Sequence, residues 1–239
     1  MTTASILIPW MASPDRAGAY GWVLGRWAQH PDVDLVVGSC RGVWCKAEAV
    51  ANALWRVTTS ILVVHDADVW CDGTTEAIEA VRGGAPWAVP HRLVHRLTGA
   101  ASRAVLDGAP TCTTLPIVQH RPGSRARPYG GVPGGGIVVL PTEHYRRVPL
   151  DPRFEGWGQE DEAWGLALHA VLGPPARGTA PLYHLWHTPQ PRTNHHIGSR
   201  DGQRLLVRYA TAARHSPEAV MAIIDEGRGV LDVTSHMGT

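Results

Sequence analysis

The sequence predicts an α/β fold, a three-layer α/β/α sandwich around a mixed, mostly parallel sheet. Two observations lead to this prediction. Short apolar runs of strand length alternate along the chain with segments of helical periodicity. The strand runs are almost continuously hydrophobic, which is typical of strands covered on both faces. With 239 residues and 44% hydrophobic content, the chain can fill one large core, and we expect a single domain over residues 1–239.

Alternating strands and helices are expected over the N-terminal part of the chain. In order, they are a strand at Ala4–Pro9, a helix opening at Pro14 and running to about Gln29, a strand at Asp34–Gly38, a helix at Cys45–Val57, a strand at Ser60–Val64, a helix at Gly73–Arg82 and a short strand at Trp87–Pro90. Proline ends the first strand and opens the first helix. The second helix places Ala47, Val50 and Leu54 on one face, as a helix packed on a sheet requires.

The middle of the chain is different. From Thr98 to about Gly135 it is rich in Gly, Pro, Arg and Thr and shows little periodicity. This stretch is too long for an ordinary connection, so it predicts a functional loop over a crevice. Beyond it we expect a strand at Ile137–Leu140, a short helix from Pro141, an acidic loop leading into a helix that ends at Gly173, a strand at Pro181–His187, and two outer helices at Asp201–Arg214 and Ser216–Glu226.

Charge and cysteine content narrow the class of protein. A net charge of +1 gives no general attraction to nucleic acid or to acidic membranes. The four cysteines lack the spacing of a metal site, and no signal peptide is evident, so we expect reduced thiols in a cytoplasmic protein. No apolar run approaches the roughly 18 residues that a membrane span requires.

Two aspartates follow the third predicted strand directly. Asp66 and Asp68 flank Ala67 where that buried strand ends. In open α/β sheets the ligand crevice lies beyond the carboxyl ends of the strands. Side chains two residues apart in extended chain point the same way, so both carboxylates can approach one hard cation or its bound phosphates. Turn and cap chemistry is the alternative, because Asp-x-Asp is common in loops.

Three consecutive acids follow a tryptophan between two glycines. Glu160 and Asp161, with Glu162, lie where a loop becomes a helix, and acids in a first helical turn are favoured by the helix dipole alone. The dipole does not explain Trp157, for which we expect an exposed position on a movable loop. A tryptophan for stacking and carboxylates that accept hydroxyl protons would suit a sugar.

Other polar residues have both a functional and an ordinary interpretation. On a strand, His184 and His187 would face opposite sides, unless the chain turns after Tyr183. If they meet, histidine and carboxylate ligands fit Mn²⁺ or Mg²⁺ bridging a diphosphate. Lys46 and Asn52 on the second helix commonly face solvent. Arg16, near the end of the first strand, either meets a phosphate or nucleobase or lies on a helix surface.

Together these residues resemble a known family. The chain is similar to the inverting GT-A glycosyltransferases, specifically the family 2-like enzymes and the galactosyltransferase and N-acetylgalactosaminyltransferase group. The first matching block runs from Trp44–Leu54 through Leu62–Trp70, a helix with Lys and Asn before the Asp-x-Asp strand. The second runs from the Gly-Gly-Val segment at 130–132 to Gly156–Glu162. Two features depart from the family: Gln159 stands where the galactosyltransferases have glycine, and the first strand lacks their Phe-Arg-Asn-Arg run.

The resemblance implies a GT-A fold, with a donor half at about 1–97, an acceptor half at about 130–190 and C-terminal helices at about 200–228. It also implies a metal site. Asp68 would bind the ion, Asp66 would contact the donor ribose or the ion, and His187 and His184 would complete the ligands.

Roles in donor binding, acceptor binding and catalysis follow from the same resemblance. Asp161 would be the catalytic base and Glu160 a ligand of the acceptor hydroxyl, while Trp157 would touch donor and acceptor. The further implied contacts are Arg16, Lys46, Asn52 and Ala67 for the donor, and Gly135 for the acceptor.

The resulting hypothesis is a metal-dependent inverting transfer of a hexose or N-acetylhexosamine from a UDP-sugar to an acceptor hydroxyl. The acceptor is left open among a saccharide, a lipid-linked intermediate, a protein hydroxyl and a modified nucleobase. One alternative is a sugar-phosphate nucleotidyltransferase, although Pro9–Ala19 lacks the glycine-rich basic loop of that class. The other is a non-catalytic carbohydrate-binding protein, in which clustered acids would repel one another without a metal or a reaction.

Overall fold

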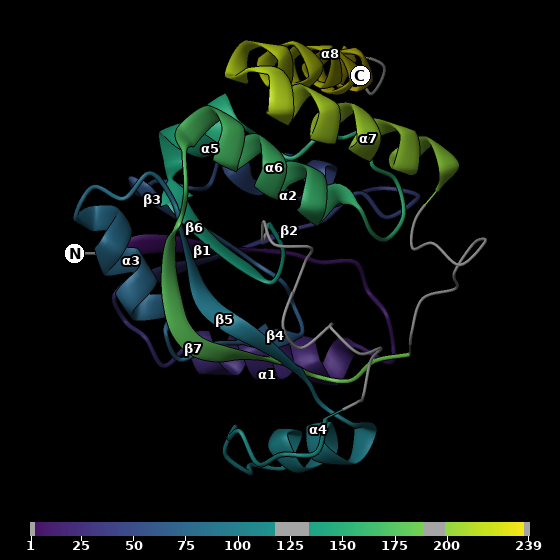
Figure 1. The fold of residues 1–239 in the computed structure, drawn as a ribbon. Coiled ribbons are helices and arrows are strands. Elements are labelled where there is room, and N and C mark those ends of the chain that lie inside the picture. The colour runs from purple at the N-terminus through teal and green to yellow at the C-terminus, as the bar shows by residue number, and fades with distance from the viewer. Residues whose placement is uncertain (1–2, 118–133, 189–198, 237–239) are drawn as a thin grey trace.

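The structure, a computed structural model, describes residues 3–117, 134–188 and 199–236 (Figure 1). Its centre is a sheet with the strand order β2-β1-β3-β6-β5-β7-β4. The strands are β1 (Ala4–Pro9), β2 (Val33–Gly38), β3 (Ile61–His65), β4 (Val69–Trp70), β5 (Ala88–Arg96), β6 (Ile137–Pro141) and β7 (Ala176–His184). The longest pairings, β1 with β2 and β5 with β7, are parallel, whereas β6 is antiparallel to both of its neighbours, β3 and β5.

Helices cover both faces of this sheet, which makes three layers. They are α1 (Ala17–Trp27), α2 (Lys46–Leu54), α3 (Thr74–Arg82), α4 (Gly99–Leu106), α5 (Thr142–Arg147), α6 (Glu160–Leu172), α7 (Arg200–His215) and α8 (Pro217–His236). Alternate side chains of each strand point to opposite faces. Leu7 therefore lies in the core on one face of the sheet, against α2, α5, α6, α7 and α8. Ile6 and Ile8 lie in the core on the opposite face, against α1 and α3. The α/β fold and its layers are as the sequence predicts.

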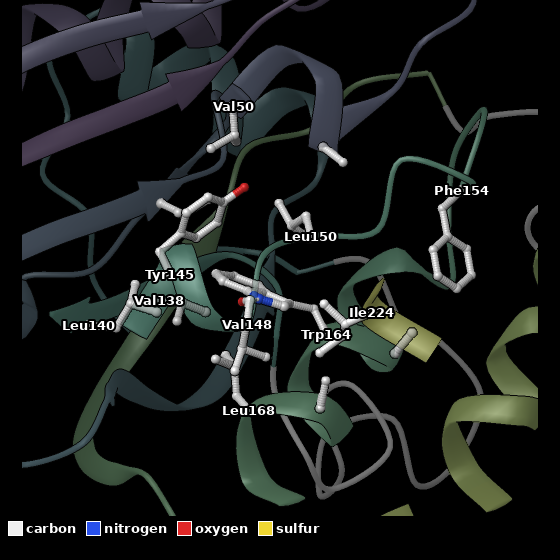
Figure 2. Close-up of a cluster of buried hydrophobic side chains, with 14 of the residues drawn as sticks. Val50, Val138, Leu140, Tyr145, Val148, Leu150, Phe154, Trp164, Leu168 and Ile224 are labelled. Carbon is white, nitrogen blue, oxygen red and sulfur yellow. Dashed lines mark hydrogen bonds between the residues drawn. The ribbon is translucent and has the colours of Figure 1, made fainter. Parts of the chain in front are cut away.

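One of these cores fixes the helix that begins with the acidic residues. Trp164 of α6 is buried beside Tyr145, with ring centroids 5.8 Å apart and planes at 74° (Figure 2). Its indole Nε1 donates a hydrogen bond of 2.8 Å to the carbonyl of Val148. Edge-to-face packing together with a satisfied indole gives one preferred orientation. The start of α6 is thereby held against the sheet.

Several predicted boundaries are wrong, for identifiable reasons. β5 runs on to Arg96 and β7 begins at Ala176, because the two pair with each other in parallel. Within the predicted long loop, α4 forms, and the hydroxyl of Thr98 caps it by accepting from the amide of Ala101 at 3.2 Å. The two-residue strand β4 was not predicted. The remainder of the predicted loop at 118–133, including the Gly-Gly-Val segment, lies outside the described residues.

In the described part of the chain, no helix is both long enough and apolar enough to cross a membrane.

Candidate active site

The two aspartates lie where β3 ends, beside the beginning of β6. The backbone N–H of Asp66 donates to the carbonyl of Gly136 at 2.8 Å, and the N–H of Gly136 donates to the Asp66 carboxylate at 3.0 Å. Gly136 has a φ of +77°, which glycine adopts without strain. The register between β3 and β6 therefore fixes the carboxyl end of β3, and with it the position of Asp66 and Asp68.

Asp68 forms a group with two histidines and an arginine, which we call the Asp68 group: Asp68, His184, His187 and Arg16. Asp68 is buried, its carboxylate lies 3.9 Å from Nε2 of His184 and 3.6 Å from Nε2 of His187, and Arg16 forms an ion pair with it. One ligand atom from Asp68 and each histidine fit within 4.8 Å of one another. The structure therefore brings together Asp68, His184 and His187, the three side chains that the sequence suggested could share one ion.

The histidines meet because β7 ends at His184. The next amide, that of Leu185, donates to the carbonyl of Asp68 at 2.8 Å and extends the pairing with β4 by one residue. Beyond it the chain is no longer a strand, and His187 lies on the same side as His184. The two imidazole centroids are 5.2 Å apart. Of the two arrangements that the sequence left open, the structure has the one in which the two histidines meet, without the turn after Tyr183, because His184 is still part of β7.

Burial and neighbouring charges together set the protonation states in the Asp68 group. It lowers the pKa of His184 to about 4, so that imidazole is neutral near pH 7 and has a lone pair to offer. Burial would raise the pKa of Asp68, but the nearby histidines and the Arg16 guanidinium outweigh it and hold that pKa below its usual value. At neutral pH, where His184 is uncharged, Arg16 is the main cation that offsets Asp68.

Asp66 belongs to a different group, which we call the Lys46 group: Lys46, Asp66, Asp161 and Glu160. The ammonium of Lys46 lies 2.7 Å from a carboxylate oxygen of Asp66 and 2.7 Å from one of Asp161. The Lys46 side chain is only 5% exposed, so it does not face solvent. Burial would lower the pKa of Lys46, but the charges of Asp161, Asp66 and Glu160 outweigh it and raise the pKa well above normal. Lys46 is a fixed positive charge that joins the end of β3 to the start of α6.

The two acids that open α6 hold protons more readily than free carboxyl groups. Burial, followed by the charge of Asp161, raises the pKa of Glu160. Burial also raises the pKa of Asp161, and Lys46 opposes this rise. One oxygen of Glu160 is buried without a hydrogen-bond partner among the described residues. A protonated Glu160 beside an ionised Asp161 is the arrangement that their surroundings favour.

Two glycines allow the segment that leads into β6 to pack closely against the start of α6. A Cβ on Gly135 would overlap the carboxylate of Asp161, and one on Gly134 would overlap the Asp161 carbonyl. The two glycines are therefore required for the close approach of this segment to α6. Gly135 lies in the site, next to the predicted base.

Trp157 is placed differently from the expectation. It is half-buried rather than exposed, because its ring stacks on Trp44 with centroids 5.0 Å apart and planes at 20°. The guanidinium of Arg16 lies 4.2 Å from the Trp157 ring centroid. Arg16 thus contacts both Asp68 and Trp157, and it lies in the site rather than on an outer helix surface.

Two further predicted donor contacts lie outside these groups. Asn52 is exposed and donates to the carbonyl of Ser39 at 2.9 Å, so the structure does not bring its side chain together with Lys46. Ala67 is buried in the core on the α1 side of the sheet. Trp44 was missed as a site residue, since a tryptophan before a helix cap carries no signal that it will stack on a distant loop.

Comparisons with known proteins define the fold. No model of a protein family and no curated protein matches the sequence. Among solved structures, glucosyl-3-phosphoglycerate synthase from Mycobacterium tuberculosis, in complex with Mn²⁺, UDP-glucose and phosphoglyceric acid, matches with a TM-score of 0.50 at 17% identity over 90% of this chain and 81% of that one. The likeness shows that the chain has the GT-A fold that the sequence predicts.

Two other matches are weaker. A Drosophila β1,4-galactosyltransferase 7 variant, in complex with manganese, UDP-Gal and xylobiose, has a TM-score of 0.47 at 12% identity over 82% of this chain and 78% of that one. The 2-C-methyl-D-erythritol 4-phosphate cytidylyltransferase of Thermus thermophilus has a TM-score of 0.39 at 14% identity over 88% of this chain and 98% of that one.

Proposed function

We propose that the protein is a metal-dependent glycosyltransferase that moves a hexose or N-acetylhexosamine from a UDP-sugar to an acceptor hydroxyl with inversion. One observation carries this proposal: in a GT-A fold, the Asp68 group lies close enough to the buried Glu160 and the partly buried Asp161 for the charge of Asp68 to act on Asp161. The first arrangement suits a cation with its diphosphate, and the second suits an attacking hydroxyl. A transfer reaction requires both.

The donor atoms of the Asp68 group fit Mn²⁺, and less well Mg²⁺. Two imidazoles and one carboxylate within 4.8 Å form a mixed nitrogen and oxygen ligand set. Burial keeps His184 neutral, as a metal ligand must be. Asp66, held by Lys46, would contact the ion or the donor ribose. A bound ion would supply Lewis-acid stabilisation of the leaving diphosphate.

The remaining chemistry belongs to the residues of the chain. Asp161 would accept the proton of the acceptor hydroxyl, since the charge of Lys46 beside it opposes the rise of its pKa and favours its ionised form. Glu160 would hold that hydroxyl through its unpartnered buried oxygen. Trp157 would contact donor and acceptor, and its stack on Trp44 would support it there.

The other donor contacts are proposed on the resemblance. Arg16 and Lys46 would counter the diphosphate charge, and Asn52 and Ala67 would be further donor contacts. Gly135 would contribute to acceptor binding by packing against Asp161, because a side chain there would overlap that carboxylate and displace it.

The experiment that tests the proposal is donor turnover across a panel of UDP-, GDP- and dTDP-sugars, with Mn²⁺ or with EDTA and with water as acceptor. We expect release of UDP from one UDP-sugar with Mn²⁺, with EDTA abolishing it, and a freed sugar of inverted anomeric configuration. Release of pyrophosphate from a nucleoside triphosphate and a sugar phosphate would instead identify a nucleotidyltransferase. Absence of turnover and of nucleotide binding would refute the proposal.

A further inference from the structure

Gln159 has an unusual backbone conformation at the start of the acidic helix. Its φ of 76° and ψ of −27° are left-handed, and it is the single non-glycine residue with positive φ in the described part of the chain. This conformation disfavours any residue with a Cβ by about 1–2 kcal/mol. A glycine would adopt it freely, as Gly156 and Gly158 do in the same loop. Non-glycine residues persist in such conformations where the surroundings hold them, often at functional sites.

The side chain of Gln159 reaches across to α7. Its Nε2 donates a 2.6 Å hydrogen bond to Oε1 of Gln203. Gly202 beside it leaves the necessary room, since a Cβ there would lie 2.6 Å from Oε1 of Gln159. That oxygen is buried and has no hydrogen-bond partner among the described residues. The amide is therefore enclosed and tied at one end to the C-terminal helices.

The C-terminal helices also hold the other end of the same loop. The hydroxyl of Tyr209 donates to the buried carboxylate of Asp151 at 2.9 Å. Arg153 donates to the carbonyl of Ile223 at 2.6 Å and to Glu226 at 2.9 Å. Trp157 lies between these two anchored ends.

We propose that Gln159, held by Gln203, is a positioning residue that fixes the first turn of α6 and with it the carboxylates of Glu160 and Asp161. The catalytic part of this inference rests on the proposed function. Asp161 is next but one to Gln159 and packs against Gly135 without spare room, so a small rotation of this turn would displace its carboxylate. A misplacement of about 1 Å can reduce a rate about 100-fold. The two outer helices are thus part of the site.

The test compares Gln159→Gly, Gln203→Leu and Gln203→Glu, with Arg204→Ala as the matched control on α7, where that side chain is 78% exposed. Gln203→Glu keeps an oxygen that accepts from Gln159, whereas Gln203→Leu removes it. The readouts are kcat and KM for turnover of the UDP-sugar found in the donor panel, and the melting temperature. Gln159→Gly separates the positioning effect from the effect on stability. It removes the hydrogen bond to Gln203, but it also relieves the backbone strain, since glycine adopts a positive φ freely.

We expect kcat to fall about tenfold or more in Gln159→Gly and Gln203→Leu, with donor KM within roughly twofold of wild type. Gln203→Glu and Arg204→Ala should retain the wild-type kcat, and Gln159→Gly should melt no lower than Gln203→Leu. A kcat within roughly twofold of wild type in both Gln159→Gly and Gln203→Leu would overturn the inference.

Amide hydrogen exchange separates failure of this inference from failure of the proposed function. If the wild-type protein turns over no sugar nucleotide, the proposed function fails, and the positioning of the first turn of α6 by Gln159 is judged on exchange alone. Exchange over residues 154–162 that is about tenfold faster in Gln159→Gly than in wild type, in a protein that remains folded, supports this positioning role. Unchanged exchange contradicts it.

Discussion

Asp66 and Asp68 are separated by one residue, yet they lie in different electrostatic surroundings. Asp68 faces two imidazoles and a guanidinium that also stacks on Trp157. Asp66 shares the buried ammonium of Lys46 with Asp161. The Asp68 group contains atoms that can bind a metal ion, and its guanidinium, that of Arg16, also contacts the ring of Trp157. In the Lys46 group the buried ammonium of Lys46 already bridges the two carboxylates. In the proposed function, ion binding would therefore belong to the Asp68 group and proton transfer to the Lys46 group.

The largest expected effect is on the proton acceptor. Asp161→Asn should reduce donor turnover about 10²- to 10⁴-fold, as removal of a positioned general base does. Binding of UDP with Mn²⁺ should be unchanged, because the Asp68 group is intact. Steady-state kinetics and calorimetry check the two halves of this prediction, with the exposed Glu162→Gln as control. Turnover at the wild-type rate would remove Asp161 from the mechanism.

The next effect concerns the fixed cation of the Lys46 group. Lys46→Met removes the buried ammonium that the partly buried carboxylates of Asp66 and Asp161 share, and should destabilise the protein by about 3 kcal/mol, the low end for breaking a buried pair. Denaturant unfolding measures this, and Arg41→Met, a change at an exposed residue, is the control. Adding Asp161→Asn to Lys46→Met should recover part of the loss. If Lys46→Met is as stable as the control, the ammonium does not bridge the two halves.

A third effect is the pH dependence of kcat. Burial raises the pKa of Asp161, so part of it stays protonated at a pH where a free aspartate is fully ionised. Only the ionised form accepts a proton, so kcat should rise with pH and its midpoint should lie at least about one unit above the ~3.9 of a free aspartate. Asp66→Asn removes a negative neighbour and should shift the rise to lower pH. A midpoint in the ordinary carboxyl range would count against the buried pair.

The smallest effect tests the stack of Trp157 on Trp44. Trp44→Leu removes the ring on which Trp157 stacks, and such an aromatic pair contributes about 0.5–1.5 kcal/mol beyond its burial. Donor kcat/KM should therefore fall by no more than about tenfold. The exposed Trp55→Leu, at 80% exposure, is the control. Equal values for the two variants would mean that the stack does not support the loop.

Much of the fold could be predicted because strong local signals coincide with tertiary structure. The β-branched run of β3 and the prolines and glycines at helix ends set those boundaries. The start of β7 could not be predicted, since Ala176–Pro181 contains Gly178 and little β-branched chain. Gly178 is there because a Cβ would overlap the carbonyl of Pro90 on β5. That need arises only once the two strands are paired.

The part of the site that could be predicted is the part that follows from the family resemblance and from the spacing of the motifs. Asp68, His184 and His187 meet as expected, and Asp161 lies beside Gly135. The burial of Lys46 between two carboxylates could not be predicted, because it depends on how α2 packs against β3 and α6. The bond between Gln159 and Gln203 depends in the same way on the packing of α7.

The division between Asp66 and Asp68 is tested most directly by calorimetric titration of UDP into wild type, Asp68→Asn and Asp66→Asn, each with Mn²⁺ and with EDTA. We expect EDTA to weaken UDP binding to wild type by at least about tenfold. The same dependence should persist in Asp66→Asn and disappear in Asp68→Asn. UDP binding that is indifferent to Mn²⁺ in wild type, or still dependent on Mn²⁺ in Asp68→Asn, would contradict the assignment of the ion to the Asp68 group.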